Sequence, residues 1–426
     1  MNSDTTSQKT TPDTTPYREI LLNIDELSLK GANQKFFLNK LLNHLRALLK
    51  LYHPYPISIV HDHLRYIIKS EQPFEKDTLA AMSRVPGLHS FSLVRSSLLE
   101  LDALLSAVKE ELAPLLNSLK DDGAVVTFKV ETTRAYKGFA HGSYEVSSWL
   151  GHHLLQAFPS LKVDVHKPRL LIKVKILQRQ IYFFTKTIKG VGGIPSGSSG
   201  DALTLLSGGF DSPVASYLMF KRGLNQSFAF FHAYPFVGDE VLDKVLSIVK
   251  KLSAYQLQTM LYIVPFGEIQ RQIVKNARPA YRTIFFRRYM LELATMLATK
   301  IAASALITGD ALGQVASQTL GNLALVNQCT NMPILRPLIG FSKPEILELA
   351  QDIGTYDISV IPQDDACSLL ADKHPVTNPY HAYWQHFAKN IFLQGDLEIA
   401  LKTTRCLRVD WMGKVAEWPN GADERN

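Results

Sequence analysis

The stretch 202-ALTLLSGGFDSPVASYLMFKRG-223 decides the fold of the second half of this chain. The apolar run 202–206 is typical of a buried strand, and a glycine turn at 207–212 leads from it into a helix that begins near Pro213. Proline is favoured at the first helical position, Ser or Asp side chains cap the start, and Gly223 follows the basic end. The free N–H groups of the first turn predict an anion site, which a phosphate can approach because two turn residues are glycines.

Two other glycine loops do not fit this turn. The GxxxxGK[ST] loop requires a lysine after its second glycine, and the dinucleotide fingerprint requires GxGxxG. Neither pattern is present at 207–212. A tight turn without a ligand is the alternative interpretation, and the ordered strand, turn and helix favour the anion site over it.

The chain of 426 residues is too long for one ordinary core, so we expect two or three domains. Residues 190–200, GVGGIPSGSSG, mark the sharpest change of composition. So much Gly and Ser can neither bury apolar surface nor hold one backbone geometry, which predicts a linker or a loop that a ligand approaches. Beyond it, apolar strands alternate with helices, a pattern that predicts a mainly parallel sheet covered by helices.

Two smaller α+β units are expected before residue 190. The first should contain strands at 17–23 and 66–70 and helices at 33–49 and 75–85. The second should contain strands at 91–94, 125–130, 170–175 and 180–185 and a helix at 143–158. Its basic residues, interleaved with aromatic ones, include Lys129, Arg134, Lys137, Lys167 and Arg169. RNA binding uses such a mixture, and alternation along a half-exposed strand explains it equally well, so both interpretations stay open.

Composition narrows the class of protein. Apolar residues make up 46% and charged residues 20%, as in a soluble globular protein, and no apolar run reaches the roughly 18 residues of a membrane helix. Residues 1–16 lack a secretory signal and are expected to be a disordered leader. The three cysteines form no zinc or disulfide pattern, which fits a cytoplasmic protein without a protein metal site. The net charge of +7 is compatible with a polyanionic partner such as nucleic acid.

The turn SGGFDS resembles the PP-loop of ATP pyrophosphatases, which bind ATP, transfer AMP to an oxygen and release pyrophosphate. Further motifs narrow the resemblance to the 4-thiouridine synthetase family, ThiI. They are YRTIFFRRYM at 281–290, LITGDALGQVASQ at 306–318, PILRPLIG at 333–340, the capping box SKPE at 342–345, GTYDIS at 354–359 and PQDDACSLLADKHPVT at 362–377. Upstream, 127–139 and 161–168 resemble the THUMP RNA-binding domain of that family, and 27–37 resembles the start of its N-terminal domain.

The resemblance implies an α/β multidomain protein. N-terminal α+β ferredoxin-like and THUMP domains are followed by a doubly wound parallel α/β PP-loop domain of the adenine nucleotide α-hydrolase-like kind. The expected divisions are a leader at 1–16, a ferredoxin-like domain at 17–82, a THUMP domain at 83–189, a Gly/Ser linker at 190–200, a PP-loop domain at 201–400 and a tail at 401–426. Only this tail follows, so the resemblance is to members without a rhodanese domain, and residues 412–426 continue no recognisable pattern.

The resemblance also implies site residues. Nucleotide-binding positions would be Leu205, Leu206, Ser207, Gly208, Gly209, Asp211, Ser212, Phe230, Phe231, Arg287, Gly309 and Gln318. Leucine and phenylalanine at such positions are as easily explained by an ordinary core. The catalytic residues would be Asp211 and Cys367, the latter carrying a persulfide sulfur because thiolates accept sulfur by exchange. Ala366 stands where relatives often show a second cysteine, so the match of this motif is incomplete.

The implied activity is that of a tRNA uridine 4-sulfurtransferase that uses ATP and Mg²⁺. Adenylation would turn the uridine 4-oxygen into a leaving group, and a persulfide would then replace it. The implied partners are tRNA and a cysteine desulfurase, and the family also allows a sulfur-carrier protein of thiamine synthesis and a homodimer, with no membrane. The alternatives are another adenylating enzyme, of the 2-thiouridylase or lysidine synthetase type, and an RNA-binding protein with a vestigial ATP site. Cys406, between Arg405 and Arg408, is the rival or resolving thiol.

Overall fold

A computed structural model describes residues 16–24, 33–62, 65–119, 125–362, 370, 372–379, 384, 391 and 393–419. The expected leader up to residue 15, Ala366, Cys367 and the last seven residues of the expected tail lie outside the described residues. The chain folds as two compact units, and the body of the second begins at Gly193. No described helix has both the length and the apolar character needed to cross a membrane.

The first unit is built on one sheet of eight strands, in the order β2-β3-β1-β4-β8-β7-β5-β6. Its elements are β1 (Glu19–Asn23), α1 (Gln34–Tyr52), β2 (Ile57–Asp62), β3 (Arg65–Ser70), α2 (Lys76–Ser83), β4 (Ser90–Ser97), α3 (Leu101–Leu119), β5 (Val126–Arg134), α4 (Ser143–Ala157), β6 (Leu161–Val163), β7 (Leu170–Ile176) and β8 (Ile181–Lys189). β5 pairs in parallel with β6 and β7, and the other pairs are antiparallel. β4 pairs with both β1 and β8, so the strands of the two expected α+β units form a continuous sheet.

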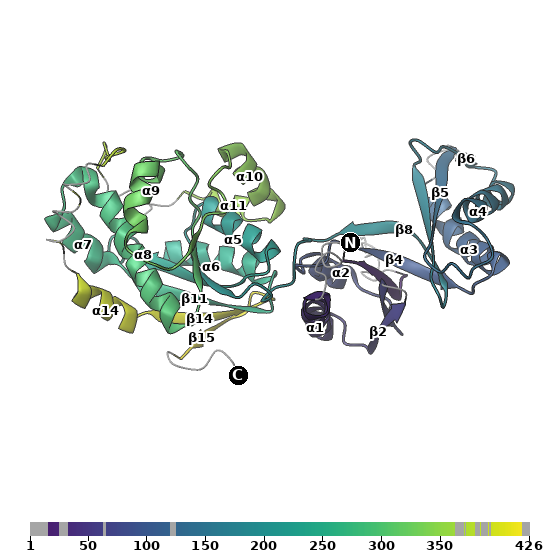
Figure 1. The fold of residues 1–426 in the computed structure, drawn as a ribbon, viewed down its shortest axis with the longest axis horizontal. Helices are drawn as coiled ribbons and strands as arrows, with labels where there is room; N and C mark the ends of the chain where they lie inside the picture. Colours follow the sequence, from purple (N-terminus) through teal and green to yellow (C-terminus); the bar gives the residue numbers. More distant parts are fainter. Residues whose placement is uncertain are drawn as a thin grey trace, which may run out of the picture. The chain divides into compact units, whose positions relative to one another are not determined.

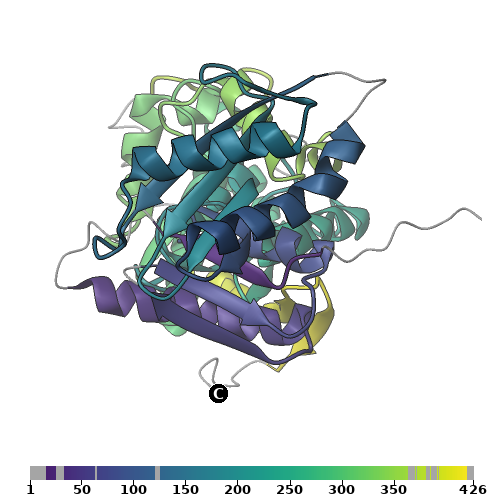
Figure 2. The same cartoon turned by 90° about the vertical axis from the view of Figure 1, so that its right-hand side faces the viewer.

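Helices α3 and α4 cover the part of this sheet made by β5, β7 and β8 (Figure 1). Leu104, Val108 and Leu112 of α3 are buried in one apolar cluster with Phe128 of β5 and Ile172 of β7. The three residues of α3 are spaced four apart, which places them on one face of the helix. Figure 2 shows the two blue helices side by side across the strands. The loops that connect these elements are thus attached to a sheet with a closely packed apolar core.

The second unit is a doubly wound α/β domain. Its elements are β9 (Asp201–Leu205), α5 (Asp211–Lys221), β10 (Asn225–His232), α6 (Glu240–Ser253), β11 (Gln258–Pro265), α7 (Gly267–Asn276), α8 (Arg282–Lys300), β12 (Ala305–Ile307), α9 (Leu320–Asn327), β13 (Ile334–Leu335), α10 (Lys343–Asp352), α11 (Tyr356–Ser359), α14 (Gln394–Lys402), β14 (Arg405–Asp410) and β15 (Val415–Trp418), with short 3-10 turns at 279–281 and 316–318. The strand order is β13-β12-β9-β10-β11-β14-β15, and the first five strands run parallel. Helices α7, α8 and α14 share one apolar cluster, while α5 and α6 pack together against the sheet (Figure 1).

The C-terminal segment differs from the expected tail. β14 pairs antiparallel with β11, and β15 pairs antiparallel with β14. Val409 is fully buried, because alternate residues of β14 face the core. Residues 405–418 therefore complete the sheet of the second unit, and the interpretation of 401–418 as a tail outside the domain was wrong.

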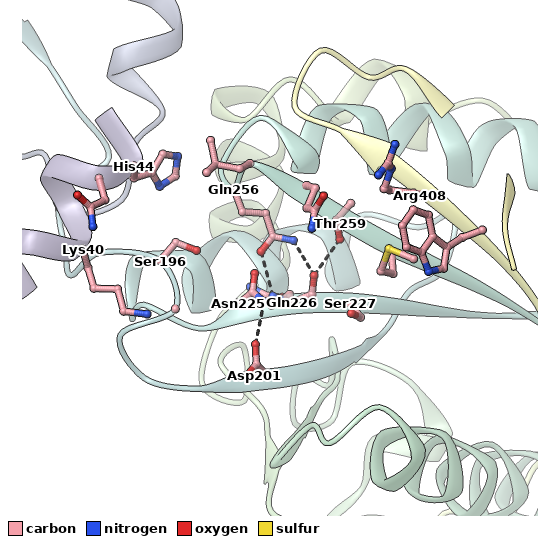
Figure 3. A pocket seen from close by; sticks show the side chains of 16 residues that line it. Lys40, His44, Ser196, Asp201, Asn225, Gln226, Ser227, Gln256, Thr259 and Arg408 are labelled. Carbon is pink, nitrogen blue, oxygen red and sulfur yellow. Dashed lines mark hydrogen bonds between the residues drawn. The ribbon is translucent and has the colours of Figure 1, made fainter. Parts of the chain in front are cut away.

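A buried amide locks β9, β10 and α5 together. Gln226, at the start of β10, accepts from Thr204 Oγ1 (2.8 Å) and donates to the Ser216 carbonyl of α5 (2.9 Å). Its main chain exchanges hydrogen bonds with the Gln256 amide, and its carbonyl also accepts from Thr259 Oγ1 (2.8 Å), as Figure 3 shows. Because buried polar groups are costly unless paired, this fully engaged amide fixes where α5 lies against the sheet.

The glycine-rich stretch 190–200 does hold a defined backbone. In its first half, the Gly192 N–H donates to the Leu88 carbonyl (3.0 Å). In its second half, the Ile194 N–H donates to the Lys221 carbonyl (3.0 Å). A Cβ on Gly193 would lie 2.0 Å from that carbonyl oxygen, so glycine is required there. The expectation of no single geometry was wrong, because main-chain hydrogen bonds hold the segment where side chains are small.

Candidate nucleotide and sulfur-transfer site

The glycine turn after β9 closes on itself through hydroxyl groups. The Ser207 N–H donates to Ser212 Oγ (2.9 Å), the two hydroxyl oxygens lie 3.1 Å apart, and the Gly209 N–H donates to Ser207 Oγ (3.4 Å). Helix α5 begins at Asp211, and its N-cap residue Phe210 makes no side-chain cap. The prediction of a Ser or Asp cap was wrong, because the hydroxyl groups of Ser207 and Ser212 form hydrogen bonds within the turn instead. The start of α5 is therefore lined by backbone N–H groups, the arrangement that binds anions.

Gly309 lies against the start of α5. A Cβ at this position would come within 2.6 Å of the Ser212 nitrogen and 2.8 Å of the Asp211 carbonyl carbon, closer than atoms can approach. Only glycine allows the chain leaving β12 to pass there. The carboxyl ends of β9 and β12 thus meet at the glycine turn, where open α/β sheets bind their ligands.

Asp211 holds two side chains from distant parts of the chain. Lys343 Nζ lies 2.9 Å from its Oδ1, and Gln314 Nε2 donates to its Oδ2 (2.9 Å). The Lys343 ammonium also lies 5.2 Å from the centre of the Phe210 ring. Lys343 is the first residue of α10. The capping box predicted at 342–345, at the start of this helix, is confirmed. Sequence reasoning used this lysine only as part of the cap and missed that it reaches the glycine turn.

A buried carboxylate holds two arginines beside the turn. Asp310 forms ion pairs with Arg287, through its Oδ1, and with Arg336 Nε (2.9 Å), and it accepts from Thr308 Oγ1 (2.8 Å). Burial alone would raise the pKa of the Asp310 carboxyl, but the attraction of Arg287, the hydrogen bonds from Arg287 and Thr308 and the charge of Arg336 hold that pKa below its usual value. Arg287 also donates to Ser317 Oγ (3.1 Å). The arrangement holds two guanidinium groups in fixed directions.

Two amides supply hydrogen-bonding groups at the same end of the sheet. Within the described structure, the side-chain oxygens of Gln314 and Gln318 are buried and have no hydrogen-bond partner. Gln318 is 8% exposed and ends a short 3-10 turn. Buried acceptors without a partner are costly, so a bound group with N–H or O–H donors would relieve both.

The apolar positions expected near the nucleotide fall into two classes. Leu206 and Phe230 are 3% and 7% exposed and belong to the core. Leu205 and Phe231 are only partly buried and pack at the edge of the main apolar cluster. The second pair therefore leaves apolar surface accessible, whereas the first pair is an ordinary part of the core.

Helix α11 packs against the glycine turn. The Ser359 hydroxyl donates to the Gly209 carbonyl (3.1 Å), and the rings of Tyr356 and Phe210 lie 5.4 Å apart. Lys244 of α6 donates to the carbonyls at the end of α11 and passes over Gly208. Ile361 and its neighbour are the last described residues before the segment with Cys367. The turn is thus held on one side by residues that precede the cysteine in sequence.

The other two cysteines are poor candidates for sulfur chemistry. Burial raises the pKa of the Cys329 thiol to about 12, which leaves almost no thiolate at neutral pH. Cys406 is 6% exposed in β14, between strands β11 and β15. The charges expected to activate it are engaged elsewhere, since Arg405 pairs with Glu417 (2.9 Å) and the Arg408 guanidinium lies over the Trp418 ring (4.8 Å).

The five basic residues of the first unit differ in their surroundings. Lys129 pairs with Glu131 at 2.7 Å, and Arg134 donates to the carbonyls of Phe139 and His141. These two are engaged within the unit. The remaining three, Lys137, Lys167 and Arg169, are exposed.

Family models match three consecutive segments of the chain. They are the ferredoxin-like domain of ThiI at residues 19–92, the THUMP domain at 100–186 and the thiamine biosynthesis protein ThiI at 197–392. With the parallel sheet and its two helical layers, this order confirms the expected fold class.

Similar proteins cover nearly the same length. A probable tRNA sulfurtransferase of Halothermothrix orenii is 40% identical over 85% of this chain and 91% of its own. One of Geobacillus kaustophilus is 37% identical over 92% and 96% of the two chains. The crystal structure of a 4-thiouridine synthetase–RNA complex with bound ATP is 31% identical, with a TM-score of 0.79 over 94% of this chain and 100% of its own. PH1313 of Pyrococcus horikoshii, 19% identical with a TM-score of 0.61, shares the fold.

Proposed function

This chain belongs to the ThiI family of tRNA sulfurtransferases, and from that premise we propose that it adenylates the uridine at position eight of tRNA and replaces its 4-oxygen with sulfur. The observation that carries the proposal is the glycine turn with its charged surroundings. The turn offers backbone N–H groups to phosphate, and Asp211 fixes Lys343 beside them. A vestigial site would have no reason to keep a buried carboxylate that orders two arginines.

We propose that the nucleotide is bound by residues predicted from the sequence and by neighbours that contact them in the structure. Ser207–Ser212 and the start of α5 bind phosphate, and Arg287, ordered by Asp310, offers a second contact to it. Leu205 and Phe231 offer apolar surface to the adenine, and the unpartnered Gln318 oxygen offers an acceptor for its amino group or for a ribose hydroxyl.

In the first step, the uridine 4-oxygen attacks the α-phosphorus of ATP, the bond to the β-phosphate breaks, and the N3 proton of the uridine is released to solvent. Pyrophosphate leaves and AMP stays on the oxygen. Negative charge grows on the phosphate oxygens, and Lys343, Arg287 and the N–H groups of the turn are placed to stabilise it. Asp211 acts here as the residue that orients Lys343, since one oxygen of its carboxylate is bound by that ammonium group.

In the second step, we propose that Cys367 carries the sulfur as a persulfide supplied by a cysteine desulfurase. The terminal sulfur attacks carbon 4 and AMP leaves with the oxygen. A second thiol then attacks the cysteine sulfur of the resulting disulfide, which frees 4-thiouridine and oxidises the two thiols to a disulfide. Because Cys406 is buried, we assign this reducing thiol to a partner or a small molecule. Delivery of sulfur to a carrier protein of thiamine synthesis would branch from the same persulfide.

We propose that Mg²⁺ would be held at this site mainly by the phosphates of ATP, with one protein ligand that it would share with Lys343 and Gln314. The described residues contain no cluster of three or more His, Cys, Asp or Glu side chains that could hold a metal. Mg²⁺ often takes one carboxylate and several phosphate oxygens, and Asp211 is the carboxylate at the turn. A bound Mg²⁺ would neutralise charge on the leaving pyrophosphate.

For the RNA, we propose that residues 83–189 form the part that binds tRNA, with Lys137, Lys167 and Arg169 as its phosphate contacts. The side chains of these three residues are exposed, whereas those of Lys129 and Arg134 are partly buried. Pyrophosphate release tests the proposal: a tRNA transcript with uridine at position eight should stimulate it, and a transcript with cytidine there should not. Equal release with both transcripts would contradict the proposed target.

A further inference from the structure

An exposed tyrosine stands on a well-fixed turn at the end of β10. Tyr234 is 69% exposed, whereas Ala233 and Val237, before and after it in the turn, are 1% and 6% exposed. The N–H groups of Phe236 and Val237 donate to the Ala233 carbonyl (2.8 Å and 3.3 Å). A Cβ on Gly267 would lie 2.0 Å from the Tyr234 carbonyl oxygen, so only glycine fits there. The backbone of the turn is thus held in place, and it presents the tyrosine ring to solvent.

The tyrosine ring ends a row of rings that begins on one face of the sheet. The ring centres of Phe230 and His232 lie 5.8 Å apart, and those of His232 and Tyr234 lie 6.4 Å apart. Alternate residues of a strand point to opposite faces. Phe231, and Leu205 on the neighbouring strand, therefore lie on the other face, where both pack against the cluster of α7, α8 and α14. The surface proposed for the adenine is thus separate from the row that ends in Tyr234.

The tyrosine turn projects beyond the same edge of the sheet as the glycine turn. The Leu206 N–H donates to the Ala229 carbonyl (2.9 Å), so β9 and β10 run side by side up to the point where the glycine turn begins. The tyrosine turn leads into α6, which packs against α5, the helix that starts at the glycine turn. Lys244 of α6 passes over Gly208. Tyr234 therefore lies at the carboxyl edge, where open α/β sheets bind their ligands.

The chemistry of the turn suits the face of a base better than a phosphate group. An aromatic ring can stack on any nucleobase, and unpaired bases of RNA are commonly bound in this way. The residues that follow the turn, Asp239 and Glu240, carry negative charges that repel a phosphate backbone. An enzyme that reacts at an atom of a base takes that base out of its stack and stacks it on side chains instead.

We propose that Tyr234 is the surface on which the target uracil of tRNA stacks while its 4-oxygen is adenylated. This inference rests on the proposed function. The ring replaces the neighbouring bases that the uracil loses when it leaves the RNA stack, and it holds the base at the edge of the sheet where the α-phosphate is bound. The contact uses the face of the ring and does not require the hydroxyl group.

The kinetic test compares two substitutions of the full-length protein. Tyr234→Phe keeps the ring, whereas Tyr234→Leu removes it and leaves an apolar side chain. Stacking of a base on an aromatic side chain is worth about fivefold to a hundredfold, so kcat/KM for tRNA in pyrophosphate release should fall roughly tenfold in Tyr234→Leu and stay within about twofold in Tyr234→Phe. The KM for ATP should change in neither. Tyr55→Leu, at an exposed tyrosine of the first unit, is the matched control and should behave as the wild type.

A photochemical probe locates the base directly. 4-Thiouridine, the product of the proposed reaction, forms a covalent bond with a group in contact with it under near-ultraviolet light. A tRNA that carries it only at position eight is bound to the full-length protein and irradiated, and the crosslinked peptide is identified by mass. We expect the peptide that contains Tyr234, with a lower yield in Tyr234→Leu.

Several results would overturn the inference. An unchanged kcat/KM in Tyr234→Leu, or an equal loss in Tyr234→Phe, would exclude stacking on the ring. A change in the KM for ATP alone would assign the ring to the adenine. Normal pyrophosphate release with loss only of the 4-thiouridine formed with a cysteine desulfurase would assign it to that protein. Crosslinks that all lie outside 233–238 would place the uracil elsewhere. A wild-type protein whose pyrophosphate release does not depend on tRNA would instead overturn the proposed function itself.

Discussion

Replacing Asp211 by asparagine removes the charge that orders Lys343 while keeping the shape of the side chain. In the structure the carboxylate binds the Lys343 ammonium at 2.9 Å and the Gln314 amide at 2.9 Å. Asparagine can still accept one hydrogen bond, but it offers no charge to the lysine. The ammonium group then has no fixed direction at the moment when charge grows on the phosphates.

Two magnitudes separate catalysis from stability in this variant. The Asp211 and Lys343 side chains are 24% and 40% exposed, so water screens the pair and its loss should cost only about 0.5–1 kcal/mol. For a domain of this size that corresponds to a fall in Tm of roughly 1–4 °C. Losing one oriented electrostatic group in a reaction of this kind costs about 10²–10³ in rate. The rate should therefore collapse while the fold persists.

The assay is tRNA-dependent pyrophosphate release at saturating ATP, with a thermal melt of each protein. Asp243→Asn, an exposed aspartate of α6, serves as the control and should match the wild type. Release by Asp211→Asn within threefold of wild type would refute the assignment of this carboxylate. The assignment would also be refuted if the loss of rate in Asp211→Asn were no larger than the fraction of this variant that is unfolded at the assay temperature.

Three further predictions follow from the same geometry. Asp310→Ala leaves two arginines without their buried carboxylate and should lower the free energy of unfolding by about 3–5 kcal/mol. The pKa of Asp310 is depressed in the folded protein, so its contribution to stability is present above the unfolded value near pH 4 and is lost as pH falls through the folded pKa. The free energy of unfolding, measured against pH in acid, should show this loss in the wild type and not in the variant. Cys367→Ser should release pyrophosphate yet form no 4-thiouridine from persulfide, whereas Cys329→Ser should stay active because its thiol is scarcely ionised; nucleoside analysis decides between them. Lys137→Ala with Lys167→Ala should weaken tRNA binding and reduce the slope of log affinity against log salt by about two, and an unchanged slope would mean that neither binds phosphate.

Local patterns made the second unit predictable. The order of strand, glycine turn and helix at 202–223 predicted strand β9, the turn after it and the start of α5, because each feature lies within one short stretch. The capping box at 342–345 was also readable, since its two partners are three residues apart. Such features depend on neighbours in sequence and need no knowledge of the tertiary fold.

Contacts between residues far apart in the sequence could not be predicted from such local patterns. Lys343 reaches Asp211 across 132 residues, and Lys244 reaches the end of α11 across more than 100. Both lysines look like ordinary surface residues in their own helices. The strands β14 and β15 were missed because nothing near 405–418 shows which edge of a sheet they extend. Strand β2 (Ile57–Asp62) was missed too, because its residues alternate weakly between buried and exposed.

The central claim is that this chain forms 4-thiouridine in tRNA at the expense of ATP. The most direct test incubates the purified full-length protein with unmodified tRNA, ATP, Mg²⁺, a cysteine desulfurase with cysteine and a reducing thiol, then digests the tRNA and identifies its nucleosides by mass. The account predicts 4-thiouridine at position eight, formed only when ATP is present and accompanied by one AMP and one pyrophosphate per thiolated base. A product thiolated at carbon 2, a lysidine, or tRNA that stays unmodified while ATP binds normally would contradict it.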